Sequence, residues 1–291
     1  MSATEPEQGR PQDGLFEIVK MNVDNSCDFV CEACSRYFAC TLPEKLDLYD
    51  HGRMDIAKRR MAGIRNKICI LSGKGGVGKT TVSTNLAVAL QKRGRTVTIL
   101  DSDFDSPSVP RMMGVRQSKL MAGREGIVPV TSEYGVRVMS VGFIIEDAEV
   151  VTWFHEMRRA ATEEFCANVA YGDGDYLIVD LPAGTGSEAI SVMQYISDLT
   201  GAIIVTMASE VSQATARRAA TLCLSAKVPL LGVIENMSGY HCPSCGEANP
   251  LDGRWKCRAC SAVYHGAVFE CGFCRAGASF FNCRRCGIFP R

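Results

Sequence analysis

The chain has 291 residues, of which 46% are hydrophobic and 22% charged. This composition is typical of a globular protein with one large domain, or one domain with appendages. Lys plus Arg and Asp plus Glu both number 32, so the overall charge gives no reason to expect binding to nucleic acid or to an anionic membrane. No apolar run is long enough to span a bilayer. The polar start MSATEPEQGRPQDG lacks the basic and apolar segments of a signal peptide, so we expect a cytoplasmic protein.

The first predicted element is a cysteine motif near the N-terminus, spaced C-x3-C-x2-C-x5-C. In a reducing compartment, a chain with 15 cysteines is expected to bind metal rather than form disulfides. The tight and irregular spacing favours a compact [4Fe–4S] cluster over a zinc ribbon with two separated knuckles. Zinc also accepts four thiolates and stays open as the alternative. The predicted ligands are Cys27, Cys31, Cys34 and Cys40.

After this motif the chain alternates short Val/Ile/Leu-rich runs with helical stretches. Strands are expected at 67–71, 96–101, 135–142, 176–182, 202–207 and 229–236, and helices at 80–94, 156–170 and 211–227. Continuous apolar strands that alternate with helices predict an α/β fold with a mostly parallel sheet covered on both faces. Ligands of such sheets bind at the carboxyl ends of the strands.

A phosphate-binding loop follows the first expected strand. The stretch SGKGGVGKTT fits G-x-x-x-x-G-K-[ST] between a strand and a helix. Backbone N–H groups of such a loop surround phosphates, and the helix N-terminus adds a favourable dipole. We expect Lys79 at the β- and γ-phosphates of ATP and the Thr80 hydroxyl on Mg²⁺. The predicted nucleotide contacts are Gly73, Gly75, Gly76, Val77, Gly78, Lys79, Thr80 and Thr81.

Carboxylates follow two further strands. The run ILDSDFDSP places Asp101, Asp103 and Asp105 after the second strand, and YLIVDLPAGTG places Asp180 after a buried one. Asp180 is suited to a direct or water-mediated Mg²⁺ contact, and Asp103 to orienting the attacking water. With the phosphate loop they predict a nucleoside triphosphatase.

The last fifty residues contain eight cysteines in four C-x2-C pairs. The first two pairs are separated by eleven residues and the last two by eight, and both spacings are typical of zinc ribbons. Basic and aromatic residues of this tail are expected to pack a small metal-binding domain rather than to bind nucleic acid. The predicted metal ligands are Cys242, Cys245, Cys257, Cys260, Cys271, Cys274, Cys283 and Cys286. The remaining cysteines, Cys69, Cys166 and Cys223, lie in apolar stretches and are predicted to be buried core thiols.

Several motifs resemble a known family. SGKGGVGKTT carries an extra lysine, Lys74, and resembles the deviant Walker A of the MinD/ParA/nitrogenase-iron-protein superfamily. DSDFDSPSVPRMMG, YGVRVMSVGF, DYLIVDLPAGTGSEA and GVIENMSGYHCPSCG resemble, in order and spacing, the Mrp/ApbC branch of P-loop ATPases that scaffold and transfer iron–sulfur clusters. CDFVCEACSRYFAC is similar to the N-terminal cluster motif of the cytosolic scaffold members of eukaryotes and their archaeal and bacterial relatives.

This resemblance implies a dimer bridged by nucleotide, either a homodimer or a heterodimer with a related ATPase. Lys74 would reach the phosphates of the partner subunit, Thr81 would help to hold phosphate and Mg²⁺, and Asn236 would contact the adenine. Cys242 and Cys245 would share a [4Fe–4S] cluster with their counterparts across the dimer, and apo iron–sulfur proteins would be the clients. Two interpretations of this pair therefore stay open: half of a zinc ribbon, or half of a shared cluster.

The chain also departs from the family pattern. Ala183 and Ser187 replace residues of the usual DLPPGTGD, and WFHEM from Trp153 replaces the usual Trp-Arg-Gly-Pro-Met, so we expect slow hydrolysis. The family's last helix and strand are replaced by cysteine pairs. These features predict four segments: a flexible N-terminus at 1–26, the cysteine motif and linker at 27–61, the P-loop ATPase domain at 62–241 and the metal-binding tail at 242–291.

Two other functions fit the same motifs. One is a MinD/ParA-like regulatory ATPase whose zinc ribbons dock other proteins. The other is an ATPase that inserts metal into one client enzyme.

Overall fold

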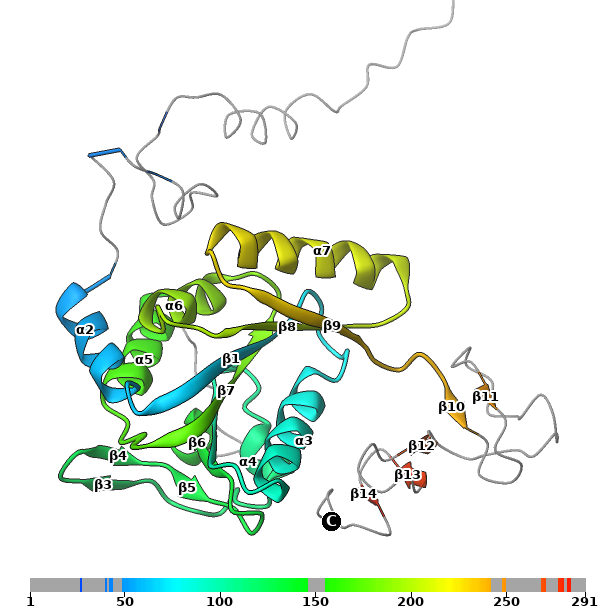
Figure 1. Ribbon diagram of the computed structural model, residues 1–291, viewed down its shortest axis with the longest axis horizontal. Coiled ribbons are helices and arrows are strands. Elements are labelled where there is room, and N and C mark those ends of the chain that lie inside the picture. The colour runs from blue at the N-terminus through cyan, green and yellow to red at the C-terminus, as the bar shows by residue number, and fades with distance from the viewer. Residues whose placement is uncertain are drawn as a thin grey trace, which may run out of the picture. The chain divides into compact units, whose positions relative to one another are not determined.

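The structure is a computed structural model that describes residues 27, 40, 42–43, 49–145 and 155–241, and four short stretches of the tail at 248–249, 268–270, 277–279 and 282–283. The main feature is a seven-stranded sheet in the order β5-β6-β2-β7-β1-β8-β9 (Figure 1). Its neighbouring strands are parallel except β5, which is antiparallel to β6. The predicted α/β fold with a mostly parallel sheet is therefore confirmed. The strands are β1 Ile64–Ser72, β2 Val97–Asp101, β5 Val130–Thr131, β6 Arg137–Ser140, β7 Gly174–Ala183, β8 Gly201–Thr206 and β9 Leu230–Glu235.

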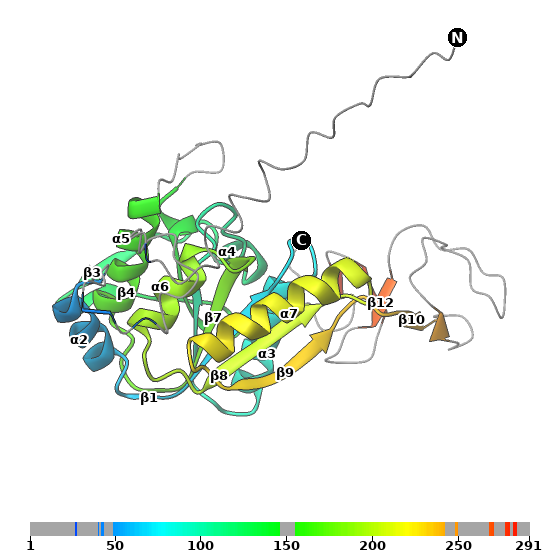
Figure 2. The same ribbon diagram turned by 90° about the horizontal axis from the view of Figure 1, so that it is seen from above.

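Helices lie on both faces of this sheet. α3 and α4 cover one face, and α2, α5, α6 and α7 cover the other (Figure 1). Figure 2 shows α7 lying along β8 and β9 at the end of the sheet. The helices are α2 His51–Arg60, α3 Lys79–Lys92, α4 Val109–Met112, α5 His155–Ala167, α6 Ser187–Tyr195 and α7 Glu210–Ser225, with a 3-10 turn, η3, at Val141–Phe143. Among the described residues, no helix has the length and apolar character needed to cross a membrane.

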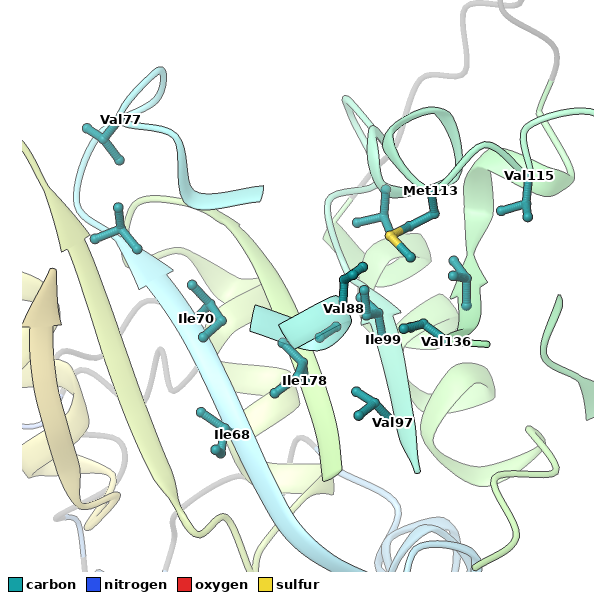
Figure 3. Close-up of a cluster of buried hydrophobic side chains, with 14 residues drawn as sticks. Ile68, Ile70, Val77, Val88, Val97, Ile99, Met113, Val115, Val136 and Ile178 are labelled. Carbon is teal, nitrogen blue, oxygen red and sulfur yellow. The ribbon is translucent and has the colours of Figure 1, made fainter. Parts of the chain in front are cut away.

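The core lies between the sheet and α3. Ile68 and Ile70 of β1, Ile99 of β2 and Ile178 of β7 point toward Val88 of α3, and all five are buried (Figure 3). Side chains alternate between the faces of a strand, so Cys69, between the two isoleucines of β1, points to the opposite layer. The three middle-region cysteines are fully buried, as predicted, and burial raises the pKa of all three thiols.

Helix α2 was not predicted, because its sequence HGRMDIAKRR has no apolar stripe. Asp50 caps it by accepting a hydrogen bond from the backbone N–H of Arg53 (3.1 Å). The Arg53 side chain then pairs with Glu163 (2.8 Å) and Glu164 (2.6 Å) of α5. The compact unit that contains the sheet begins at Tyr49, ahead of the predicted boundary at residue 62. Tertiary contacts, namely packing against α5 and these ion pairs, rather than local periodicity, hold this helix in place.

The end of the sheet at β9 differs from the prediction that both faces are covered. Every residue of β9 is exposed except the half-buried Gly232. The large apolar side chains Leu231 and Val233 are 51% and 57% exposed. The alternation of apolar strands with helices predicts a covered sheet, but it does not reveal that β9 is the outermost strand.

The remaining strands form small sheets. β3 Met121–Gly123 and β4 Gly126–Val128 make a hairpin beside the main sheet. In the tail, β10 pairs with β11, and β12, β13 and β14 form a second antiparallel group. These tail strands are Tyr240–His241, Ala248–Asn249, Val268–Glu270, Gly277–Ser279 and Asn282–Cys283.

Candidate functional site

The predicted phosphate loop joins the end of β1 to the start of α3. Gly76 and Gly78 have φ angles of 76° and 85°, in the left-handed region that favours glycine. Gly78 is also the N-cap of α3, and a Cβ there would lie 2.3 Å from Nδ2 of Asn236. Glycine at this position therefore serves both the turn and the close approach of another strand end. The backbone N–H groups of the first turn of α3 are left at the mouth of the loop, where an anion is stabilised.

Lys79 and Thr80 converge on one carboxylate. Lys79 Nζ lies 2.9 Å from Oδ2 of Asp180, and Thr80 Oγ1 donates to the same oxygen at 2.7 Å. Ser83, one helical turn after Lys79, donates to Oδ1 at 2.5 Å. Asp180 is fully buried and Lys79 nearly so, and a buried charge is tolerated only when it is paired and hydrogen-bonded. The strand end of β7 and the start of α3 thus form one polar cluster inside an apolar sheet.

Two aspartates at the end of β2 have different surroundings. Asp101 is fully buried and accepts hydrogen bonds from the backbone N–H groups of Asp103 and Val109 (both 3.2 Å) and from Ser140 Oγ (3.0 Å). Burial and the neighbouring charge of Asp180 raise the pKa of Asp101. These contacts make Asp101 a brace for the loop that follows β2.

Asp103 is half-buried and faces the cluster. Its Oδ1 accepts from the backbone N–H of Ser106 (3.1 Å), which closes the loop after β2. Burial raises the pKa of Asp103, while the charge of Lys79 opposes this rise. A carboxylate with a raised pKa near a lysine can accept a proton or hold a water.

The ends of β7 and β9 also touch the phosphate loop. Gly184, just after β7, donates its backbone N–H to the carbonyl of Ser72 at 2.8 Å. Asn236, just after β9, donates from Nδ2 to the carbonyl of Val77 at 2.9 Å. The loop is therefore held from both sides by residues that follow parallel strands.

The other predicted loop residues are described as well. Lys74, Gly75 and Gly76 are exposed, and Thr81 is half-buried in the first turn of α3. Gly73 lies against α7, since a Cβ there would come within 2.3 Å of the backbone of Thr215. The structure thus brings together the predicted residues from the ends of β1, β2, β7 and β9.

The predicted metal cysteines fall mostly outside the described residues. Cys27 and Cys40 are half-buried free thiols, and Cys283 ends β14. Outside the described residues lie Cys31, Cys34, Cys242, Cys245, Cys257, Cys260, Cys271, Cys274 and Cys286. Their metals stay predictions.

Sequence reasoning missed three residues of the site. Ser83 could have been found, because it lies four positions after Lys79 on the same helix face. Arg158 and Glu188 form an ion pair at 2.5 Å beside the loops of the site. They lie on different helices, and no local signal connects them.

Comparisons with known proteins agree with this arrangement. The family described as ParA, NUBPL iron-transfer P-loop NTPase, matches residues 63–266. An iron-sulfur cluster carrier protein from Methanocaldococcus jannaschii is 39% identical over 229 residues, which cover 78% of each chain. The cytosolic Fe-S cluster assembly factor NUBP2 from Bos taurus is 42% identical over 192 residues, 64% of this chain and 71% of that one.

A solved structure is also similar. The nucleotide-binding protein from Archaeoglobus fulgidus, in complex with ADP, has 38% sequence identity and a TM-score of 0.61. The match covers 69% of this chain and 78% of that chain.

Proposed function

Because the chain belongs to the NUBPL iron-transfer P-loop NTPase family, we propose that it binds and hydrolyses ATP and that it carries iron–sulfur clusters for the assembly of iron–sulfur proteins. The observation that supports this most is the convergence of Lys79 and Thr80 on Asp180 at the end of a central strand. The family match, at residues 63–266, covers this whole region. A cytosolic location is part of the proposal.

The residues of the cluster fit a magnesium nucleotide. Mg²⁺ prefers oxygen ligands, and a threonine hydroxyl and a carboxylate are the two that the phosphate-loop fold supplies. The Lys79 ammonium, now on Asp180, lies at the start of α3, where it can turn to the phosphates. When bound, Mg²⁺ neutralises charge on the phosphate oxygens. We assign Thr80 as its ligand and Asp180 as a direct or water-mediated contact.

Other residues complete the proposed ATPase. Asp103 is assigned to orient the attacking water, and Asn236 to contact the adenine. Lys74, which is exposed, is assigned to the phosphates of a second subunit, either a second copy or a related ATPase. Ala183 and Ser187 depart from the family's switch sequence, so slow hydrolysis is expected.

The cysteines are proposed to hold the cargo and to support its transfer. We assign the four N-terminal cysteines to one [4Fe–4S] cluster in each monomer. We assign Cys242 and Cys245 to a cluster shared across a dimer. In the sequence they come just after IENMSGY and β10, and a site split between subunits responds to nucleotide-driven closure. Zinc is proposed for the last four cysteines.

Anaerobic reconstitution with iron and sulfide tests the cargo. The wild-type dimer should gain a brown chromophore, since thiolate-to-iron charge transfer absorbs visible light and d¹⁰ zinc does not. Changing Cys242 and Cys245 to Ser should remove the iron of the shared cluster, keep that of the N-terminal cluster, and weaken the dimer. Changing Cys257 and Cys260 to Ser should leave the iron of the shared cluster in place.

One result would contradict this proposal. If the wild type stays colourless and both double variants lose the same zinc ion, the four cysteines form a zinc ribbon in place of the transfer site. It would replace the carrier function with that of a regulatory ATPase with a docking tail.

A further inference from the structure

Three segments that are far apart in the sequence meet at Arg158 of α5. Its Nη2 lies 2.8 Å from Oδ1 of Asp105, in the loop after β2, and its Nη1 lies 2.5 Å from Oε1 of Glu188, in the first turn of α6. One guanidinium therefore joins the segment that follows β2 to the segment that follows β7. Asp103 lies in the first of these segments, and Asp180 lies in β7 just ahead of the second.

The pairing is partly shielded from water. The side chain of Glu188 is 9% exposed, that of Arg158 26% and that of Asp105 55%. Burial alone would raise the pKa of Glu188, but the hydrogen bond from Arg158, with help from its own backbone N–H, lowers it overall. A planar guanidinium presents donors on separate nitrogens to both carboxylates at once, whereas the three donors of an ammonium share one small nitrogen.

Helix α5 gives Arg158 a fixed base. Farther along the same helix, Glu163 and Glu164 pair with Arg53 of α2 at 2.8 and 2.6 Å. Arg158 is thus anchored on a helix that does not belong to either loop. A direct contact between the two loops would leave them free to move together. The contact through Arg158 instead fixes each loop relative to helix α5.

Each partner of Arg158 is close to a residue of the nucleotide site. Asp105 lies in the turn that Asp103 closes by accepting from the backbone N–H of Ser106 (3.1 Å). Glu188 lies in the first turn of α6, after the loop in which Gly184 donates to the carbonyl of Ser72 (2.8 Å). A shift of either loop would therefore change its ion pair with Arg158.

We propose that Arg158 is a positioning residue that couples the loop after β2 to the start of α6, so that Asp103 and the Gly184 loop take their catalytic positions together. The proposal rests on the ATPase activity proposed above. Arg158 pairs with one carboxylate in each of the two loop segments, so it acts on the site through them. Its loss should slow the chemical step more than it weakens nucleotide binding.

The first test uses the full chain and steady-state ATP hydrolysis. Arg158→Met keeps the length of the side chain but removes the charge, and we expect kcat to fall about tenfold while KM and MgADP affinity change by less than about threefold. Arg158→Lys should recover part of the loss, because an ammonium can reach one carboxylate at a time. Glu188→Gln should add little in the Arg158→Met background, since the two residues act as one unit.

Arg65→Met is the matched control. Arg65 pairs with Asp175 at 3.2 Å, and its side chain is 77% exposed. This variant should keep the wild-type kcat. A wild-type kcat in Arg158→Met would overturn the proposal, as would a loss of kcat that only follows a lower melting temperature of the whole protein.

Hydrogen exchange gives a second readout that does not need hydrolysis. Asp105→Asn should speed exchange at 184–188 in the wild-type background and have no such effect in Arg158→Met, because the connection is already broken. If the wild type hydrolyses no ATP, the proposed function fails, and this exchange comparison decides on the coupling alone. Equal exchange at 184–188 with and without Asp105→Asn would then refute it.

Discussion

Strands β7 and β9 belong to one sheet and both consist largely of apolar residues, but only β7 is buried. β7 lies between β2 and β1, and its residues from Leu177 to Leu181 are fully buried. β9 is the last strand, and Val233 at its centre is 57% exposed. The comparison shows that an apolar strand pattern predicts pairing in the sheet, whereas the position in the strand order decides burial.

The two strands also deliver site residues in different ways. Near the end of β7 lies Asp180, whose charge is enclosed by three donors at 2.5 to 2.9 Å. β9 ends before Asn236, which makes hydrogen bonds to Val77 (2.9 Å) and Thr206 (2.8 Å) from a half-buried position. Asp180 is held by burial and by charged and hydroxyl donors, whereas Asn236 is held by two hydrogen bonds at a half-buried position. We therefore expect substitutions in the cluster around Asp180 to reduce activity more than substitution of Asn236.

The largest effect is expected where the phosphate loop meets β7. Lys79→Ala removes both the phosphate contact and the cation beside Asp180, so we expect hydrolysis to fall by at least about a hundredfold. Calorimetry with ATP and a phosphate-release assay measure it, and circular dichroism checks that the protein is folded. Unchanged ATP affinity and turnover would remove the ATPase function.

A matched pair of valines tests the contrast in burial. Val179→Ala in β7 opens a cavity on the face of the sheet opposite α3, and it should lower the free energy of unfolding by about 2 to 3 kcal/mol. Val233→Ala in β9 should change it by about 0.5 kcal/mol or less. Urea unfolding measures both. Equal losses would show that β9 is covered in solution.

Much of the site could be predicted because its signals are local. The phosphate loop is a contiguous pattern between a strand and a helix, and Asp180 could be identified from its place at the end of a buried run. The same logic gave the mostly parallel sheet. Asn236 came from the family resemblance alone, and its contact with Val77 depends on the turn after β9.

The rest depends on contacts between distant segments. The sequence HGRMDIAKRR predicts no buried helix, since α2 is held by Arg53 reaching α5. Arg158 and Glu188 are thirty positions apart. From the sequence alone, each is predicted to be a solvated charge on the surface. The exposure of β9 was not predicted, because it depends on the order of the strands. That order is set by how the helices pack, and it cannot be inferred from the sequence of one strand.

Asn236 tests the strand end at the edge. Asn236→Ala removes one amide donor, a contact with a net value of about 1 kcal/mol, so nucleotide affinity should weaken by about five- to tenfold. Titration with MgADP measures the change. The control is Asn66→Ala near the start of β1, which removes an amide donor to the carbonyl of Asp175 (3.0 Å). A loss as large as that of Lys79→Ala would contradict the distinction between the two strand ends.

The smallest effect concerns acid sensitivity just beyond β7. Burial raises the pKa of Glu188, and the stronger opposing effect of Arg158 brings it below its ordinary value of 4.5. A carboxyl group whose pKa is lower in the folded than in the unfolded state adds stability that is complete above the unfolded pKa and lost as the pH falls through the folded pKa.

Glu188→Gln should therefore be less stable than the wild type at pH 7, by about 1 kcal/mol or less because Arg158 is partly exposed. Urea unfolding should show this difference shrinking below about pH 4.5. Glu235→Gln, on the exposed end of β9, should follow the wild type throughout. A difference for Glu188→Gln that persists undiminished into acid would mean that Glu188 acts through packing rather than through its charge.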